Sequence, residues 1–197
     1  MKNYNRPHGH YWSFKTILQD LRLHEDDIYC EVGCGGGILL NMAMSKVKKG
    51  KAIDHSKDMV ELTMQNNRRD IEEGKLEVIQ GNAEQLPWSA GSVTACASAN
   101  MFFFLKQPKP MLREVFRILA PGGRFSMVTM KNGFWAKITF GWLYALKLYT
   151  DKEMASMLIE VGFSNVKVET KAGIMQACYG EKKSDKEVQN QEVSAAK

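Results

Sequence analysis

Short apolar runs and segments with helical spacing follow one another along most of the 197 residues. A strand signal ends near residue 32, and residues 38–46 then place Ile38, Leu39, Met42 and Ala43 at helical spacing. This order predicts a strand, a glycine-rich loop and a helix. Further strands are expected at 51–54, 76–79, 93–98 and 124–130, and a helix at 110–119.

The last third of the chain contains clearer signals for where helices and strands begin and end. Thr150 and Glu153 form the sequence of a capping box, which predicts a helix from about 151 to Val161 with Gly162 at its end. Residues 166–170 and 174–179 read as two closing strands joined by a turn at 171–173. From Glu181 onward four lysines, four acids and no aromatic residue predict a disordered tail over 181–197.

Two apolar segments lie outside this strand and helix pattern. Residues 7–23 carry a face of Tyr11, Trp12, Phe14, Ile17, Leu18 and Leu21 at helical spacing. Residues 134–148 are rich in aromatic and aliphatic side chains but are too short and too polar for a membrane span. The second segment fits an apolar pocket, peripheral contact with a membrane surface, a dimer interface or ordinary core packing.

The candidate chemistry begins at an alternating glycine run. Glu31 stands two residues before Gly33, which is followed by Gly35 and Gly37. Glycines after a strand let the backbone turn sharply and bring peptide N–H groups and a helix N-terminus close to a ligand. A dinucleotide fingerprint would need a sixth-position glycine where Ile38 stands, which disfavours a nicotinamide-dependent dehydrogenase.

Further signals follow in order. Asp54 ends the second strand, 17 residues after Gly37. It is either a ligand contact or a cap partner of the helix that starts near Ser56, and the two roles are compatible. Next come the segment Gly81-Asn82-Ala83-Glu84-Gln85-Leu86-Pro87-Trp88, then Ser98 to Phe104 at the end of the fourth strand, and then the turn Pro121-Gly122-Gly123.

These motifs together resemble the class I S-adenosylmethionine (SAM) methyltransferases, and specifically the type 11 group that includes the ubiquinone and menaquinone C-methyltransferases. The resemblance covers residues 29–130. It implies SAM as cofactor, with S-adenosylhomocysteine as product. The implied cofactor-binding residues are Glu31, Gly33, Cys34, Gly35, Gly37, Asp54, His55, Met59, Asn82, Ala83 and Ser98.

The resemblance also implies individual roles. Glu31 would approach the positively charged methionyl end, and Asp54 would accept hydrogen bonds from both ribose hydroxyls. Asn82 stands where the family has an acid that reads the adenine edge; it keeps an acceptor oxygen and loses the charge. Thr94 also replaces a frequent acid, at a position that is structural in the family.

The family fold is an α/β, Rossmann-like, doubly wound sheet of seven strands in the order 3-2-1-4-5-7-6, with strand 7 antiparallel. The expected domain spans residues 1–180. It includes an N-terminal lid helix at 1–25 and a cap segment at 131–149. Substrate contacts are expected from Tyr11, Trp12, Asn100, Phe102, Trp135 and Tyr144.

The expected reaction is in-line displacement of the methyl group by a small apolar or aromatic acceptor. Holding and desolvating the nucleophile can lower much of the barrier, so no general base is obligatory. If the acceptor must be deprotonated, Tyr11, His10, His55 and Tyr144 are candidates among which the sequence does not choose. A non-catalytic, cofactor-binding or interaction protein of the same fold is the alternative, and the identity of the acceptor is not encoded in these motifs.

Composition restricts the classes of ligand and the cellular compartment that we expect. A net charge of +5 without a basic stripe argues against nucleic-acid binding. Four cysteines without a C-x-x-C pair, and no apolar leader, favour reduced thiols in a cytoplasmic protein. His8 and His10 lack further ligands at suitable spacing, so no metal site is expected. We expect a monomer or homodimer without stable membrane insertion.

Overall fold

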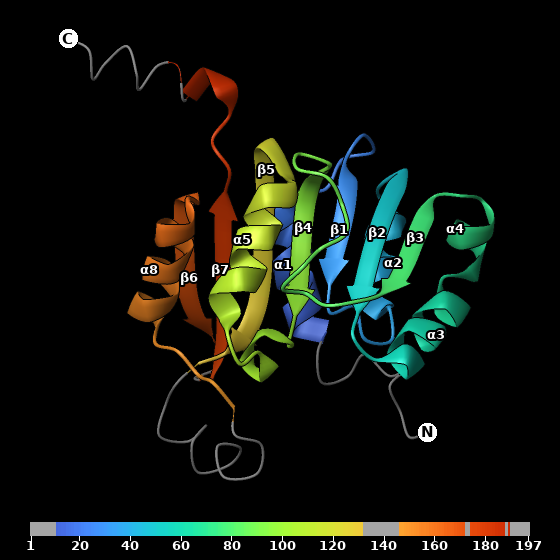
Figure 1. The fold of residues 1–197 in the computed structure, drawn as a ribbon, viewed down its shortest axis with the longest axis horizontal. Coiled ribbons are helices and arrows are strands. Elements are labelled where there is room, and N and C mark those ends of the chain that lie inside the picture. Colours follow the sequence, from blue (N-terminus) through green and yellow to red (C-terminus); the bar gives the residue numbers. More distant parts are fainter. Residues whose placement is uncertain (1–10, 132–145, 172–173, 188, 190–197) are drawn as a thin grey trace.

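A computed structural model describes residues 11–131, 146–171, 174–187 and 189 of the chain. Seven strands form one sheet in the order β3-β2-β1-β4-β5-β7-β6 (Figure 1). The pairs from β3 to β5 are parallel, whereas β7 runs antiparallel to both β5 and β6. The predicted sheet order and its antiparallel strand are confirmed.

The strands are short apart from β5. Their bounds are β1 Ile28–Val32, β2 Lys49–Asp54, β3 Leu76–Gln80, β4 Val93–Ala99, β5 Leu119–Met130, β6 Ser164–Lys171 and β7 Met175–Glu181. The second strand begins two residues before the predicted Lys51, because Lys49 and Gly50 still pair with β1. The parallel strands β1 to β4 end at the same edge of the sheet, which therefore gathers the loops that follow them.

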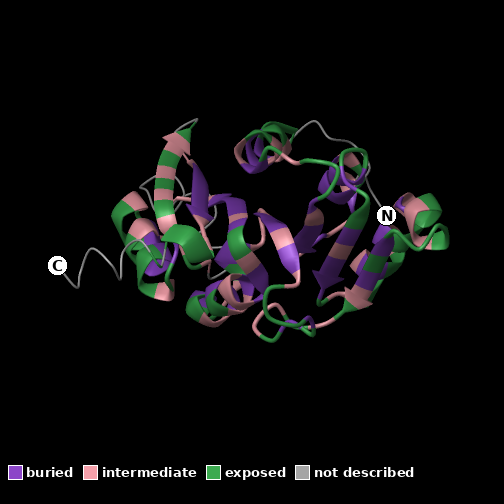
Figure 2. Ribbon diagram, turned by 90° about the horizontal axis from the view of Figure 1, so that it is seen from above, coloured by how far each residue is buried: buried purple, intermediate pink, exposed green. Residues whose placement is uncertain are grey.

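Helices cover both faces of the sheet (Figure 1). On one face lie α1 (Tyr11–Leu21), α2 (Ile38–Met44), α3 (Lys57–Asn66) and the short α4 (Arg68–Glu72). On the other lie α5 (Pro108–Ile118) and α8 (Asp151–Val161), with a single 3-10 turn, η1, at Phe102–Phe104. Two apolar clusters fill the spaces between sheet and helices, and Figure 2 shows the buried residues concentrated in the central strands.

The N-terminal helix α1 is part of this layered core. Ile17 and Leu21 are fully buried and α1 packs on β4, β5 and β7. Over its described part, Tyr11–Leu21, the segment expected to form a lid covers the sheet with its apolar face. Its exposed residues are Tyr11 and Trp12 in the first turn, and Lys15 and Gln19 on the side that faces away from the sheet. Residues 1–10 lie outside the described part of the chain.

Helix α8 begins and ends as its sequence predicts. The Thr150 hydroxyl accepts from the Glu153 N–H, and the Glu153 carboxylate accepts from the Thr150 N–H at 2.7 Å. Gly162 ends the helix with φ +118, in the left-handed region. A Cβ at this position would lie 2.9 Å from the Phe116 ring, so Gly162 also permits the contact between α8 and α5.

The Pro121-Gly122-Gly123 segment is a correction to the predicted boundaries. It does not precede the fifth strand but interrupts it, since β5 already pairs with β4 at Leu119 and resumes the pairing at Arg124. The helix before it ends at Ile118. The extra residues form an irregularity in the ladder, for which Gly122 supplies φ +78.

The tail also begins later than residue 181. Glu181 belongs to β7, and the backbone of Lys182 exchanges hydrogen bonds with Gly122 and Gly123. The Lys182 ammonium donates to the carbonyl groups of Phe116 and Leu119. Residues 181–187 are thus ordered, because they hold the irregular start of β5.

Thr94 has a structural role at the opposite edge of the sheet from the glycine loop. Its hydroxyl donates to Asp27 at 2.6 Å and accepts from the Ile28 N–H. Arg124 pairs with the other oxygen of Asp27 at 2.6 Å. The carboxylate missing at residue 94 is thereby supplied by Asp27.

The described helices include none that is long and apolar enough to cross a membrane. Most of the expected cap segment lies outside the described residues. Its final residues return along η1, where the Lys147 N–H donates to the Phe103 carbonyl.

Candidate functional site

The glycine loop between β1 and α2 is tied to the neighbouring strand. Gly33, Gly35 and Gly37 all have positive φ, at +76, +52 and +74. The N–H groups of Gly33 and Cys34 both donate to the Ile53 carbonyl, at 2.8 and 3.2 Å. The loop therefore turns directly over the end of β2, with a backbone that favours glycine at three positions.

Helix α3 holds the other side of this loop. Thr63 and Asn66 lie in the last turns of α3, and Asn67 caps the end of this helix. Their side chains donate to the carbonyl groups of Gly35, Gly36 and Gly37, at 2.6, 2.8 and 3.2 Å. We call these three side chains the α3 clamp. The clamp turns three successive carbonyl groups toward α3, so the opposite side of the loop is left free of them.

Cys34 extends the clamp. Its sulfur lies 3.6 Å from the Thr63 oxygen, and the single Thr63 hydroxyl hydrogen already goes to Gly35, so the thiol is the donor. Burial raises the pKa of the Cys34 thiol to about 12. A buried thiol of this kind is structural rather than reactive.

Asp54 combines the two roles that its position suggests. One carboxylate oxygen accepts from the Gly35 N–H at 2.9 Å, and the other accepts from the Ser56 N–H at 3.0 Å. Ser56 itself caps α3 by accepting from the Met59 N–H. Asp54 therefore organises the turn before α3 while its side chain borders a cavity. The His55 ring, 88% exposed, lies 3.4 Å from the same carboxylate.

Glu31 is the buried acid of the site. It is 2% exposed, and the Tyr29 hydroxyl donates to it at 3.3 Å. Burial raises the pKa of Glu31 well above its ordinary range; the Tyr29 hydrogen bond opposes this, and the nearby Asp54 charge adds to it. A buried carboxylate with so little compensation is stabilised by a cation placed beside it.

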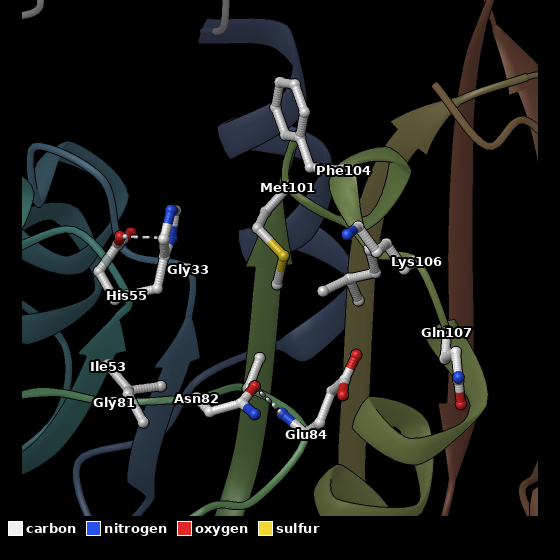
Figure 3. A pocket seen from close by; sticks show the side chains of 13 residues that line it. Gly33, Ile53, His55, Gly81, Asn82, Glu84, Met101, Phe104, Lys106 and Gln107 are labelled. Carbon is white, nitrogen blue, oxygen red and sulfur yellow. Dashed lines mark hydrogen bonds and ion pairs between the residues drawn. The ribbon is translucent and has the colours of Figure 1, made fainter. Parts of the chain in front are cut away.

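The loops after β1, β2, β3 and β4 enclose an open cavity of about 490 Å³ at the carboxyl edge of the sheet (Figure 3). Asp54, Asn82 and Glu84 border it on one side, and the loop after η1 borders it on the other. Its lining is Gly33, Ile53, Asp54, His55, Gly81, Asn82, Ala83, Glu84, Met101, Phe104, Leu105, Lys106 and Gln107.

Five of the predicted cofactor-binding residues line this cavity: Gly33, Asp54, His55, Asn82 and Ala83. Glu31, Cys34, Gly35 and Gly37 lie in the adjoining strand and loop. Met59 lies in the first turn of α3, and Ser98 is buried in β4; neither is part of the lining.

None of the predicted substrate-contact residues that the structure describes lines this cavity. Phe102 is 1% exposed and packs edge-on against Tyr149, so it is a core residue rather than an acceptor contact. Asn100 has φ +55 and follows β4 without lining the cavity, and Tyr11 and Trp12 do not line it either. Trp135 and Tyr144 lie outside the described residues, as does His10.

Of the segment Ser98 to Phe104, which was expected to border the reaction centre, Met101 and Phe104 line the cavity; Leu105, Lys106 and Gln107 were not predicted from the sequence. The 3-10 turn buries Phe102 and Phe103 and leaves Phe104 exposed at the cavity, followed by Leu105, Lys106 and Gln107. Period-two or helical patterns do not reveal a single such turn. The α3 clamp, by contrast, had a signal: polar residues at 63, 66 and 67 recur at helical spacing after Val60, which is buried.

Over the described ranges, no cluster of three or more histidine, cysteine or acidic side chains is placed to hold a metal ion. The polar groups of the cavity are instead single carboxylates and amides spread along its walls.

A family model described as a methyltransferase domain, of type 11, matches residues 30–127. Among curated proteins, the putative methyltransferase YrhH of Bacillus subtilis is 30% identical over 111 residues, which cover 55% of this chain and 61% of YrhH. The chain thus spans about three fifths of the length of this relative.

Solved structures resemble the whole fold. A putative methyltransferase of Haloferax volcanii, in a complex with the Trm112 methyltransferase activator, superposes with a TM-score of 0.79 at 19% identity; the match covers 90% of this chain and 92% of the other. The geranyl diphosphate C-methyltransferase of Streptomyces coelicolor, solved with S-adenosylhomocysteine, gives 0.73 at 13% identity, over 86% of this chain and 79% of that chain.

Proposed function

The chain belongs to the type 11 group of class I methyltransferases, and on this premise we propose that it binds SAM and transfers its methyl group to a small apolar or aromatic acceptor. The observation that carries the proposal is the position of three groups: Gly33 and Asp54 line the cavity, and the buried Glu31 lies in β1 directly before the glycine loop. Each of these groups suits a different part of the cofactor.

The cavity offers a fitting partner for each end of SAM. Asp54, at the end of β2, has the carboxylate geometry for two ribose hydroxyls. Glu31 provides negative charge beneath the glycine loop for the ammonium and sulfonium groups. The loop has no Cβ at Gly33, where one would lie 2.6 Å from the Met101 side chain.

Bound SAM would supply an activated methyl group on a positively charged sulfur. The chain has to hold the acceptor in line with that methyl group and exclude water. Met101, Phe104 and Leu105 give the cavity an apolar wall, which supports an apolar or aromatic acceptor. A screen of extracts with labelled SAM, followed by mass identification of the product, identifies the acceptor.

A second candidate is a protein that uses the fold through a partner. It is favoured by the Haloferax relative of similar fold, which was solved with a methyltransferase activator. The two candidates differ in a direct test: transfer of label from SAM to a compound in an extract by the purified chain alone contradicts an obligatory partner.

Calorimetry tests cofactor binding. The wild-type chain is expected to bind SAM and S-adenosylhomocysteine, and Asp54→Ala is expected to weaken both several-fold to a hundredfold, about 1 to 3 kcal/mol for lost charge-assisted hydrogen bonds. Asp58→Ala is the matched control, because Asp58 is exposed in the first turn of α3 and does not line the cavity. A folded wild-type chain that binds neither compound contradicts the proposed function.

A further inference from the structure

The side-chain oxygen atoms along the cavity differ in how many hydrogen bonds they already accept from the rest of the chain. Both oxygens of Asp54 accept from backbone N–H groups. The Asn82 side-chain oxygen accepts from the Glu84 N–H at 2.9 Å. The Glu84 carboxylate, by contrast, takes part in no hydrogen bond or ion pair with any residue that the structure describes; only its backbone N–H does, as the donor to Asn82.

These groups follow neighbouring strands of the sheet and so lie one after another along the cavity wall. Asp54 ends β2, and Asn82 and Glu84 follow β3, the next strand in the sheet. Figure 3 shows Asn82 and Glu84 side by side, joined by their hydrogen bond, with Gly81 and Ile53 next to Asn82. A nucleoside whose ribose is held by Asp54 would place its base toward this wall.

We propose that Glu84, rather than Asn82, recognises the amino group of the adenine base. The inference rests on the proposed function, since it assumes that the cavity takes an adenosine compound. The amino group at C6 is a hydrogen-bond donor and needs an acceptor. The hydrogen bond from the Glu84 N–H fixes the orientation of the Asn82 amide, whereas the neighbouring carboxylate is uncommitted and negatively charged.

This assignment also makes Glu84 the specificity residue for the base. A hypoxanthine base carries an oxygen at C6, which would face the carboxylate as acceptor against acceptor. A site that is built to receive a donor rejects an analogue that lacks it, because the polar group of the protein is left unpaired. A glutamine at residue 84 offers both a donor and an acceptor, and tolerates either base.

The test compares S-adenosylhomocysteine with S-inosylhomocysteine by calorimetry. The wild-type chain is expected to prefer the adenosine compound by at least about tenfold, within the range for a single charged hydrogen bond. Glu84→Gln is expected to reduce this preference to within about threefold. Glu72→Gln, which removes an exposed acid on α4 outside the cavity, controls for net charge and is expected to keep the wild-type ratio.

Three results separate the possibilities. Loss of the preference in Glu84→Gln but not in Glu72→Gln supports the inference. A preference that survives in Glu84→Gln and is lost in Asn82→Ala overturns it and assigns the base to Asn82. If the folded wild-type chain binds neither compound, the proposed function fails and this inference fails with it. Circular dichroism confirms that each variant is folded.

Discussion

The carboxylate of Glu31 illustrates how one residue can be costly for folding and useful for binding. It is 2% exposed, and among the described residues its carboxylate accepts one hydrogen bond, from Tyr29. Taking a charge out of water costs free energy unless another charge compensates for it. Within the proposed function, the cationic end of SAM supplies that compensation, and the neutral sulfur of the product does not.

We expect Glu31→Gln to stabilise the unliganded chain at neutral pH. Because the pKa of Glu31 is raised above the unfolded value of 4.5, the folded state holds a proton that the unfolded state loses as the pH rises. Its contribution to stability is therefore complete below about pH 4.5 and decreases as the pH rises through the higher folded pKa. Urea denaturation from pH 4.5 to 8 measures this slope, which the variant should lack.

The matched control is Glu61→Gln, an exposed acid on α3 that pairs with Lys57. It is expected to leave the slope unchanged. Glu31→Gln is also expected to weaken SAM more than S-adenosylhomocysteine, since only SAM carries the sulfonium charge. An equal loss for both compounds would contradict the charge role of Glu31.

The role of the α3 clamp is best tested at Thr63, where conservative substitutions can remove or keep the hydroxyl group. The Thr63 hydroxyl donates to the Gly35 carbonyl and accepts from Cys34. Thr63→Val keeps the shape and removes the hydroxyl, so we expect S-adenosylhomocysteine binding to weaken about tenfold, equivalent to about 1.4 kcal/mol. Thr63→Ser keeps the hydroxyl and should restore most of the affinity. Equal affinities in Val and Ser variants would contradict a positioning role.

At the scale of elements, the glycine loop and α3 act as one unit. The loop is joined to β2 through the Ile53 carbonyl and to α3 through the clamp, and Asp54 links the loop to the start of α3. A motif of alternating glycines predicts the turn, but the side chains that bind its carbonyl groups lie 28 or 30 residues away in the sequence. Their position follows from tertiary packing, which the glycine spacing does not encode.

A comparison of Gly37 in the glycine loop with Gly74 after α4 separates the cost of backbone strain from the cost of side-chain crowding, because both have a similar positive φ. Gly37 and Gly74 have φ +74 and +67, but a Cβ at Gly37 would lie 2.5 Å from the Asn67 amide, whereas one at Gly74 would meet nothing within 4 Å. Gly74→Ala is expected to cost about 1 kcal/mol from backbone strain alone. Gly37→Ala should cost at least about 2 kcal/mol and displace the clamp. Urea denaturation of both variants compares them, and equal losses would contradict the crowding argument.

At the scale of the whole molecule, the sequence predicted what depends on periodicity and local chemistry. The capping box at Thr150 and the glycine end of α8 follow from local chemistry and are correct. The sheet order is also correct, but it was implied by the family resemblance and not by periodicity. The differences from expectation fall where tertiary contacts override local signals. Helix α1 is a layer of the core because the sheet needs cover over β4 and β5, and Phe102 is buried because a single 3-10 turn directs it inward.

The ordered residues after β7 give the last prediction. Lys182 closes the start of β5 through two backbone hydrogen bonds and two from its ammonium group, while Ser184 and Glu187 form a local cap beyond it. Truncation after Glu181 removes all four contacts, and we expect it to cost about 2 to 4 kcal/mol, at about 0.5 to 1 kcal/mol each.

Truncation after Glu187 is the matched control, since it keeps every one of these hydrogen bonds. It should leave the free energy of unfolding, measured in urea, within about 0.5 kcal/mol of the full chain. Lys182→Met on the full chain then separates the ammonium from the backbone: it should reproduce part of the loss only. If the chain that ends at Glu181 were as stable as the chain that ends at Glu187, the irregular start of β5 would form without Lys182. The segment after β7 would then contribute nothing to the stability of the fold.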